Sequence, residues 1–467
     1  MNFLILLTEG IGLRNFFMTR FLSLLCGEGE VVIWHALPEQ IVHVHDHPAA
    51  DRLRWQSMPE HHEGQLPFLF RRAKLIAQLY WQNEAGTEMV LKRTTLRGKG
   101  VYKLRNRLAE AIGRACGRSH NQILWLDDMH ARAVRQSRYF VDFLKFLSFE
   151  RPDVVFCTHQ RSPLAVPAML AARQLGIPTA TFIYSWDNLP KGRMAVHADY
   201  FLVWSQHMKD EMRNYYPDVP EERIFVTGTP QFEHYFNSAL FEPREKFLPS
   251  YGLDPSRPVV CFSGDDLDTS PHDPQYLADL AEALQPLPLP ERPQILFRRC
   301  PTDAGNRYRP VLEKHPEIAN VEPQWLILTN NDWSKVIPTQ DDVKLLVNTV
   351  AHSDAVINVG STMAVDFAIL NKPAIYLAYN PSGWKANDGW SIEQIYRFPH
   401  FNPMQHFEPV AWCRSKEELC AVVIQSLRDP QCRAENRRAW VEFLAQTPLD
   451  QASNRCVEAL VRISQKT

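Results

Sequence analysis

The stretch AVINVGSTMAVDFAILNKPAIYLAY, residues 355–379, decides the fold of this chain. Its first apolar run, Ala355–Val359, predicts a short buried parallel strand that ends at Gly360. Apolar residues then recur at helical spacing over Met363–Leu370, and the Asn-Lys-Pro that follows predicts the end of that helix. A second apolar run, Ala374–Tyr379, predicts the next strand. Strand, turn, helix and strand in this order are typical of a doubly wound α/β domain.

The turn after the first strand has the residue types of an anion site. Ser361 and Thr362 stand at the expected helix N-terminus, where free backbone N–H groups, the helix dipole and two hydroxyls favour phosphate oxygens. Asp366 lies one turn further on, where a carboxylate can accept hydrogen bonds from ribose hydroxyls. We therefore expect Gly360, Ser361, Thr362 and Asp366 to bind a nucleotide. The alternative is an ordinary crossover helix with a capped N-terminus and an acid on its surface.

Length and composition limit the other possibilities. A chain of 467 residues is longer than one ordinary core and predicts two domains. The net charge of −2 provides no field that would attract nucleic acid, so we expect no nucleic-acid partner. The nine cysteines include no C-x-x-C pair and stand in mostly apolar contexts, as reduced thiols of a cytoplasmic protein do.

The N-terminus, MNFLILLTEG, predicts a first strand rather than a signal peptide, and no apolar run is long enough to span a bilayer. We therefore expect a cytoplasmic protein, either free or on the inner face of the cytoplasmic membrane.

Strand and helix patterns alternate along both halves of the chain, which predicts parallel sheets. The segment 241–258 is charged, contains proline and has no periodicity, so we place a linker there. The predicted domains are 1–240 and 259–435, followed by a helical tail at 436–467. The fold class that we expect is α/β, with two Rossmann-like doubly wound domains facing a cleft. Predicted strands of the first half are Asn2–Leu7, Val31–Ala36, Asp153–Thr158, Thr179–Ile183, Tyr200–Trp204 and Arg223–Thr227.

The segment Lys92–Arg118 carries nine basic residues against one acid, Glu110. A basic amphipathic helix of this kind can lie on an anionic membrane surface. The alternative is a helix that packs its apolar stripe on the core and leaves a solvated basic face. The stripe consists of Val101, Leu104, Leu108, Ile112 and Ala115.

Two patterns resemble metal sites. His43, His45 and His47 alternate along one short segment, followed by the pair His61-His62. Imidazoles in a row along one strand rarely converge on one ion, and no Cys or Glu stands at ligand spacing, so a polar strand edge or loop is the better interpretation. The D-x-D sequence at 266–268 is better interpreted as a solvated loop. We expect neither a metal nor a cofactor.

Three segments resemble the GT-B glycosyltransferases, and among them enzymes of the bacterial envelope: the CDP-glycerol glycerophosphotransferase-like proteins and relatives of UDP-N-acetylglucosamine 2-epimerase. SDAVINVGSTMAVDFAILNKPAIYLAY (353–379) is similar to their nucleotide site. LFRRCPTD (296–303) is similar to their R-x-H-P segment, with Cys300 in place of the usual His, and D-x-A-S-x-R (450–455) to their closing D-G-x-x-S-x-R segment. The resemblance covers most of 228–455, and over 1–227 it is mainly architectural.

The resemblance implies transfer of a sugar or phospho-polyol from a nucleotide-activated donor to a cell-envelope glycan, such as capsule or lipopolysaccharide, or to a lipid-linked acceptor, without a metal. It implies that Arg298, or Arg299, neutralises the diphosphate. Glu9, Asp187 and His159 follow predicted strands of the first half and are candidates for the base that activates the acceptor hydroxyl. A UDP-sugar epimerase of the same fold and a non-catalytic, membrane-associated scaffold are the alternatives.

Overall fold

The computed structural model describes residues 1–38, 50–59, 62–95, 101–303, 305–328, 336–385 and 389–465. The chain forms two compact units. Unit 1 comprises Met1–Gln231, Phe398–His400 and Phe443–Thr467, and unit 2 comprises Phe232–Arg397 and Phe401–Glu442. The division falls at Gln231, so the segment 241–258 lies inside unit 2, and the end of the chain belongs to unit 1.

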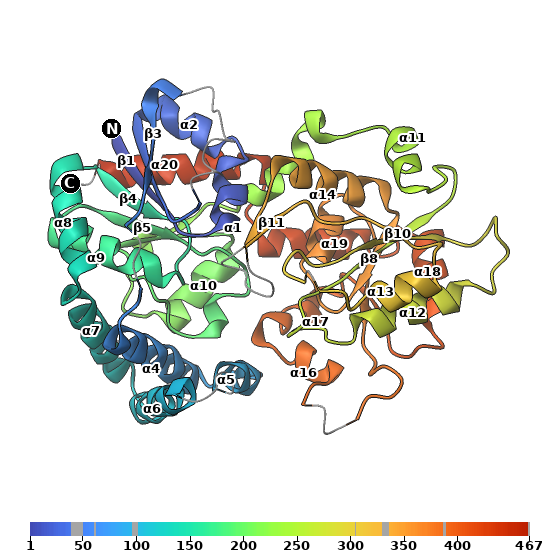
Figure 1. Cartoon of the computed structure of the whole chain (residues 1–467), viewed down its shortest axis with the longest axis horizontal. Coiled ribbons are helices and arrows are strands. Elements are labelled where there is room, and N and C mark those ends of the chain that lie inside the picture. Colours follow the sequence, from blue (N-terminus) through green and yellow to red (C-terminus); the bar gives the residue numbers. More distant parts are fainter. Residues whose placement is uncertain are drawn as a thin grey trace. The chain divides into compact units, whose positions relative to one another are not determined.

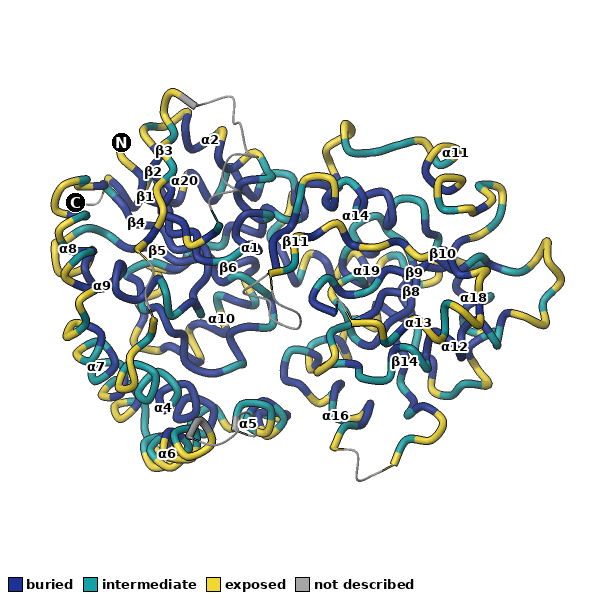
Figure 2. Tube along the Cα trace, viewed as in Figure 1, coloured by how far each residue is buried: buried dark blue, intermediate teal, exposed yellow. Residues whose placement is uncertain are grey.

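Unit 1 is built on a seven-stranded sheet in the order β3-β2-β1-β4-β5-β6-β7, in which all neighbours are parallel. The apolar runs of its central strands are buried on both faces, as expected when helices cover both sides of a parallel sheet (Figure 2). The strands are β1 (Asn2–Leu7), β2 (Glu30–His35), β3 (Leu53–Ser57), β4 (Val154–Cys157), β5 (Thr179–Phe182), β6 (Tyr200–Val203) and β7 (Ile224–Val226).

Helices of unit 1 come from both ends of the chain. Helix α20, drawn in red in Figure 1, contacts α2, β4 and β6, whereas α9 contacts β4 and β5 and α10 contacts β6 and β7. Helix α4 contacts α6 and α7. The bounds are α1 (Gly10–Gly12), α2 (Phe21–Glu28), α4 (Gln65–Gln82), α5 (Thr87–Thr95), α6 (Val101–Cys116), α7 (His120–Arg135), α8 (Arg138–Glu150), α9 (Val166–Gln174), α10 (Gln206–Tyr215) and α20 (Ala452–Ser464).

Unit 2 is built on a six-stranded parallel sheet in the order β10-β9-β8-β13-β14-β15, and a separate antiparallel pair is formed by β11 (Leu326–Ile327) and β12 (Val336–Ile337). The six strands are β8 (Val259–Ser263), β9 (Gln294–Arg298), β10 (Ala319–Asn320), β13 (Ala355–Asn358), β14 (Ala374–Leu377) and β15 (Ala411–Cys413). The helices are α11 (Arg244–Phe247), α12 (Asp273–Leu284), α13 (Arg309–Lys314), α14 (Gln340–His352), α15 (Met363–Ile369), α16 (Ile392–Tyr396), α17 (Met404–Phe407), α18 (Leu419–Arg428) and α19 (Ala434–Leu444).

Two parallel sheets with helices around them confirm the predicted fold class of two Rossmann-like, doubly wound domains. The stretch 355–379 forms β13, α15 and β14, as predicted. None of the helices that the structure describes has both the length and the hydropathy to cross a bilayer.

Candidate functional site

In each unit the strand order reverses beside the first strand of its sheet. In unit 2, β8 lies between β9 and β13 and all three are parallel, so the loops that follow Ser263, Arg298 and Asn358 leave the same edge. Doubly wound proteins bind ligands outside the carboxyl ends of their strands, at the point of reversal. The residues that the sequence singles out, Gly360–Asp366, begin at this edge.

The turn after β13 is held by its own groups. The N–H of Ser361 donates to Oδ1 of Asn358 (3.0 Å), the N–H of Met363 lies 3.5 Å from Ser361 Oγ, and the hydroxyl of Tyr376 donates to the Ser361 carbonyl (3.3 Å). Thr362 precedes α15 and is exposed, and its side chain makes no capping hydrogen bond. Of the groups expected to meet a phosphate, the Ser361 amide is therefore already used, whereas the Thr362 hydroxyl is accessible.

Gly360 has a left-handed backbone, with φ +68°, and aromatic rings fill the space beside it. A Cβ at this position would lie 2.7 Å from Phe401 Cζ and 3.4 Å from Tyr396 Cε1. On this side Gly360 is packed against the rings of Phe401 and Tyr396, and its part in binding a nucleotide stays a prediction. Asp366 is half-buried in the first turn of α15, the position that the sequence predicts.

Arg298 ends β9 with its side chain buried. Its Nη2 lies 2.9 and 2.8 Å from the two carboxylate oxygens of Asp342, which also accept from the Trp325 indole (2.5 Å) and the Gln324 N–H (2.7 Å). The Nη1 of Arg298 has no hydrogen-bond partner among the described residues. The charge of Arg298 is paired with Asp342 inside unit 2. Contact between Arg298 and a diphosphate stays a prediction. The alternative, Arg299, is paired with Glu322.

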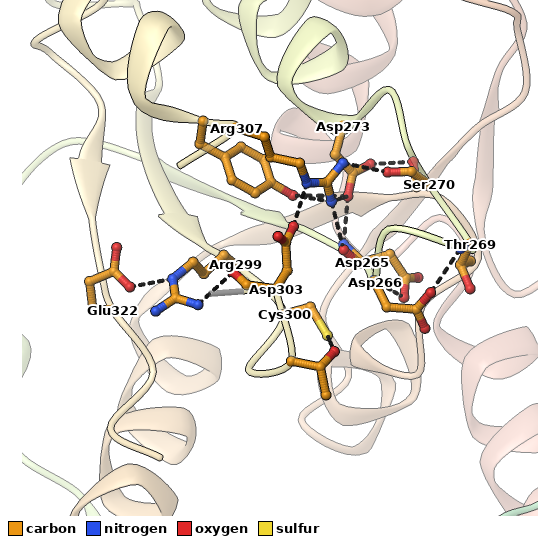
Figure 3. Close-up of polar contacts among 12 residues, drawn as sticks. Asp265, Asp266, Thr269, Ser270, Asp273, Arg299, Cys300, Asp303, Arg307 and Glu322 are labelled. Carbon is orange, nitrogen blue, oxygen red and sulfur yellow. Dashed lines mark hydrogen bonds and ion pairs between the residues drawn. The ribbon is translucent and has the colours of Figure 1, made fainter. Parts of the chain in front are cut away.

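A second polar cluster lies at the ends of β8 and β9 (Figure 3). Asp273, the first residue of α12, is completely buried and accepts from the Asp265 N–H (2.5 Å), the Ser270 hydroxyl (2.5 Å) and the Tyr308 hydroxyl (3.3 Å). Burial raises the pKa of the Asp273 carboxyl to about 6, because removal from water disfavours the charge more than these donors favour it. Arg307 lies beside it, with 3.8 Å between Nη2 and an Asp273 oxygen.

Sequence analysis did not identify Asp273 or Arg307. An Asp-Pro pair that opens a helix is a capping signal, and nothing in the local sequence shows that this carboxyl is buried. Asp266 belongs to the D-x-D sequence and accepts the Thr269 N–H (2.8 Å), so it stabilises its own turn.

In unit 1 the strand order reverses between β1 and β4, and two of the predicted residues meet there. Glu9 follows β1 and His159 follows β4, and Oε1 of Glu9 lies 3.1 Å from Nδ1 of His159. Their side chains are 15% and 11% exposed, and the Tyr184 ring lies edge-on to the imidazole, 4.3 Å away. A carboxylate beside an imidazole orients the ring and supports proton transfer at its other nitrogen.

Asp187 is part of a different set of contacts. It pairs with Lys191 and accepts from Nδ2 of Asn188 (2.8 Å), whose Oδ1 accepts from Gln160 (3.0 Å). Burial raises the pKa of Asp187, but the interactions with Lys191, His400 and Ser185 together lower it by more, so the pKa lies well below its usual range. A carboxylate stabilised in this way is a weak base. Trp186, beside it, is buried.

The basic segment covers the end of α5 and all of α6, and only part of its apolar stripe packs on the core, where Ile112 lies against a buried cluster that includes Ala73 and Ala77. Leu104 and Leu108 are 71% and 52% exposed, whereas Ala109 is fully buried. A Cβ on Gly113 would lie 2.8 Å from the Ala73 carbonyl oxygen of α4, so small residues form the packed face together with Ile112 and Cys116. Arg97 and Lys99 lie outside the described residues.

Over the part of the chain that the structure describes, no group of three or more His, Cys, Asp or Glu residues could hold a metal ion. His43, His45, His47 and His61 lie outside that part.

No protein-family model and no curated protein sequence matches this chain. Solved structures match it over its whole length. A putative UDP-N-acetylglucosamine 2-epimerase from Listeria monocytogenes gives a TM-score of 0.55 at 11% identity, covering 100% of this chain and 97% of its own. The UDP-GlcNAc 2-epimerase from Neisseria meningitidis, bound to UDP-GlcNAc, gives 0.54 at 11% identity, covering 99% and 100%. A glycosyltransferase from Rickettsia africae ESF-5 gives 0.50 at 12% identity, covering 100% and 99%.

At such identities a structural likeness establishes the fold alone. The two parallel sheets described above are the arrangement that these glycosyltransferases and epimerases share, which confirms the resemblance at the level of architecture. The chain therefore has the GT-B fold.

Proposed function

We propose that this chain is a glycosyltransferase that moves a sugar or phospho-polyol from a nucleotide-activated donor to a cell-envelope glycan or lipid-linked acceptor, without a metal. The observation that supports it is the position of Thr362 and Asp366. An exposed hydroxyl and a half-buried carboxylate lie beside the strand reversal of unit 2, in a fold whose solved examples include an enzyme bound to UDP-GlcNAc.

In this proposal unit 2 binds the nucleotide. The hydroxyls of Ser361 and Thr362 donate to phosphate oxygens, and Asp366 accepts from the ribose. Arg298 contributes less to the binding of the diphosphate than an unpaired arginine would, because Asp342 offsets its charge. The Gly360 backbone shapes the turn and leaves the hydroxyls on the accessible side.

Unit 1 supplies the base. The Glu9–His159 pair is the best candidate, since its two groups lie 3.1 Å apart at the strand reversal of that unit. Asp187 is the weaker candidate, because Lys191 stabilises its charged form.

A UDP-sugar epimerase is the second candidate, favoured by two matched structures that carry that name. An epimerase needs no acceptor. Incubation of UDP-GlcNAc with the protein alone discriminates between the two reactions, because only an epimerase produces a new isomer without an added acceptor.

The test is ligand-induced thermal stabilisation by UDP, CDP, GDP and ADP. A nucleotide at about 100 times its Kd stabilises the folded state by about 2.7 kcal/mol, so a bound diphosphate raises Tm. We expect Asp366→Asn to lose most of that rise. Asp341→Asn is the matched control, since Asp341 is an exposed acid in the first turn of α14 and should keep the full rise. A wild-type protein whose Tm responds to none of the four nucleotides contradicts the proposal.

We also propose that α6 contacts an anionic lipid surface, which would bring the enzyme to the inner face of the cytoplasmic membrane. Two exposed leucines, Leu104 and Leu108, lie among the exposed cations Lys103, Arg107 and Arg114. Apolar side chains flanked by basic ones are the combination that binds an anionic bilayer surface.

A further inference from the structure

The loop between β8 and α12 is held at both ends by the side chains of Arg307 and Asp273. Residues 264–270 leave the sheet at the strand reversal of unit 2, and the loop carries three acids, Asp265, Asp266 and Asp268. Its first residue, Gly264, lies so close to Tyr308 that an added Cβ would be 2.6 Å from the phenol oxygen. We call residues 264–270 the acidic loop.

Arg307 joins the two ends of the acidic loop (Figure 3). Its Nη2 donates to the Asp265 carbonyl (2.9 Å) and its Nη1 donates to the Ser270 carbonyl (2.7 Å). The same guanidinium donates to the Tyr308 hydroxyl (2.9 Å) and pairs with Asp303. The planar guanidinium of arginine carries five N–H donors and the ammonium of lysine only three, so a lysine could replace a part of these bonds at most.

Asp273 binds the same two ends of the acidic loop through its carboxylate. It accepts from the Asp265 N–H and from the Ser270 hydroxyl, both at 2.5 Å. Each end of the loop thus has one group bound to Arg307 and one bound to Asp273, and the two clamping side chains lie 3.8 Å apart. A buried guanidinium–carboxylate pair that satisfies the backbone of a loop fixes the shape of that loop.

We propose that Arg307 is a positioning residue that holds the acidic loop in the conformation required for nucleotide binding beside Ser361 and Thr362. This inference rests on the proposed function. The acidic loop follows β8 and the Ser361 turn follows β13, and these neighbouring strands flank the reversal at which the ligand is expected. Arg307 acts through the loop and does not itself touch the nucleotide.

Two measurements test this role on the full chain, with Arg309→Ala as the matched control. Arg309 lies two residues away, its side chain is 72% exposed, and among the described residues it pairs with Glu313 on its own helix. Without ligand, hydrogen–deuterium exchange of the peptide covering 264–270 should be faster in Arg307→Ala than in the wild type or in Arg309→Ala. In calorimetric titration, the Kd for UDP should rise about tenfold or more in Arg307→Ala, since a loop that is no longer preorganised must be ordered when UDP binds.

Arg307→Lys guards against a variant that fails to fold, because it keeps the charge, the aliphatic stem and the pairing with Asp303. It should keep the wild-type Tm and still show faster exchange at 264–270 and weaker UDP binding. Faster exchange with an unchanged UDP Kd overturns the positioning role, and so does unchanged exchange in both variants. A wild-type protein that binds none of UDP, CDP, GDP and ADP overturns the proposed function, whereas wild-type binding that Arg307→Ala leaves intact overturns this inference alone.

Discussion

Position 360 makes two demands that only glycine among the amino acids meets. Its φ of +68° is costly for a side chain with a Cβ, and the ring of Phe401 occupies the place where that Cβ would lie. Gly252 meets only the first demand, since it has φ +73° and no atom within 4 Å of an added Cβ. Comparing substitutions at Gly360 and Gly252 therefore separates the energetic cost of a left-handed backbone from the cost of a clash with a neighbouring ring.

We predict that Gly360→Ala lowers the free energy of unfolding by about 2–5 kcal/mol, the sum of about 1–2 for a left-handed backbone and about 1–3 for overpacking. Gly252→Ala should lose only the first part, about 1–2 kcal/mol. Urea denaturation followed by fluorescence measures both. Equal losses in the two variants would show that the Phe401 ring does not restrict position 360.

At this scale the sequence predicted the turn and missed its surroundings. The glycine after an apolar run indicated the end of β13, but Phe401 lies 41 residues later in the sequence, and local pattern does not show which distant ring packs there. Arg298 is a similar case. The resemblance implied that Arg298 neutralises a diphosphate, whereas its partner Asp342, on α14, is found only in the folded structure. An Arg298→Ala variant would leave a buried carboxylate unpaired, so it is a poor probe of nucleotide binding.

Among the elements, α6 shows why periodicity leaves the buried face undecided. Leu104 and Leu108 belong to the predicted stripe and are exposed, whereas the helix packs on α4 through Ala109, Ile112 and Gly113. Small residues allow two helix backbones to approach closely, and a hydrophobicity pattern gives them little weight. The basic amphipathic character of the segment was predictable, and its orientation was not.

We predict that the protein co-sediments with vesicles containing phosphatidylglycerol and much less with neutral vesicles. Each cation near an anionic surface contributes about 1 kcal/mol, so the charge reversal Arg107→Glu should weaken binding about tenfold or more. Arg138→Glu on α8 is the control, since that side chain is 89% exposed and lies outside α6. Equal binding by wild type, Arg107→Glu and Arg138→Glu would remove the membrane proposal.

Strands were predictable where apolar runs meet clear end signals. β1 has its predicted bounds, Asn2–Leu7. The edge strand β3 was missed because its residues, LRWQS, are polar and partly exposed and lack the apolar run of a central strand.

At the scale of the whole molecule, segments from both ends of the chain build unit 1, which no local sequence pattern indicates. The segment 436–467 was expected as a helical tail, and its part from Phe443 onward belongs to unit 1, more than 200 residues after that unit's last strand. Arg455 connects the two parts, since its Nε donates to the Thr227 carbonyl (2.8 Å) and its Nη2 donates to the Gln446 carbonyl (3.0 Å). Helix α20 buries Cys456, Leu460 and Ile463 completely.

We predict that the fragment 1–231 alone melts lower than the same fragment joined through a flexible linker to 443–467. Without α20, apolar surface on α2 and β4 is exposed. Burial of Leu460 and Ile463 contributes about 1.5–3 kcal/mol each, which corresponds to a Tm difference on the order of 10 °C for a unit of this size. Circular dichroism melting compares the two proteins. A fusion carrying Leu460→Ser and Ile463→Ser should melt like the bare fragment, because it has the linker and the added length but not the apolar contact. If the bare fragment and the intact fusion melt alike, α20 is a tail that the first unit does not need.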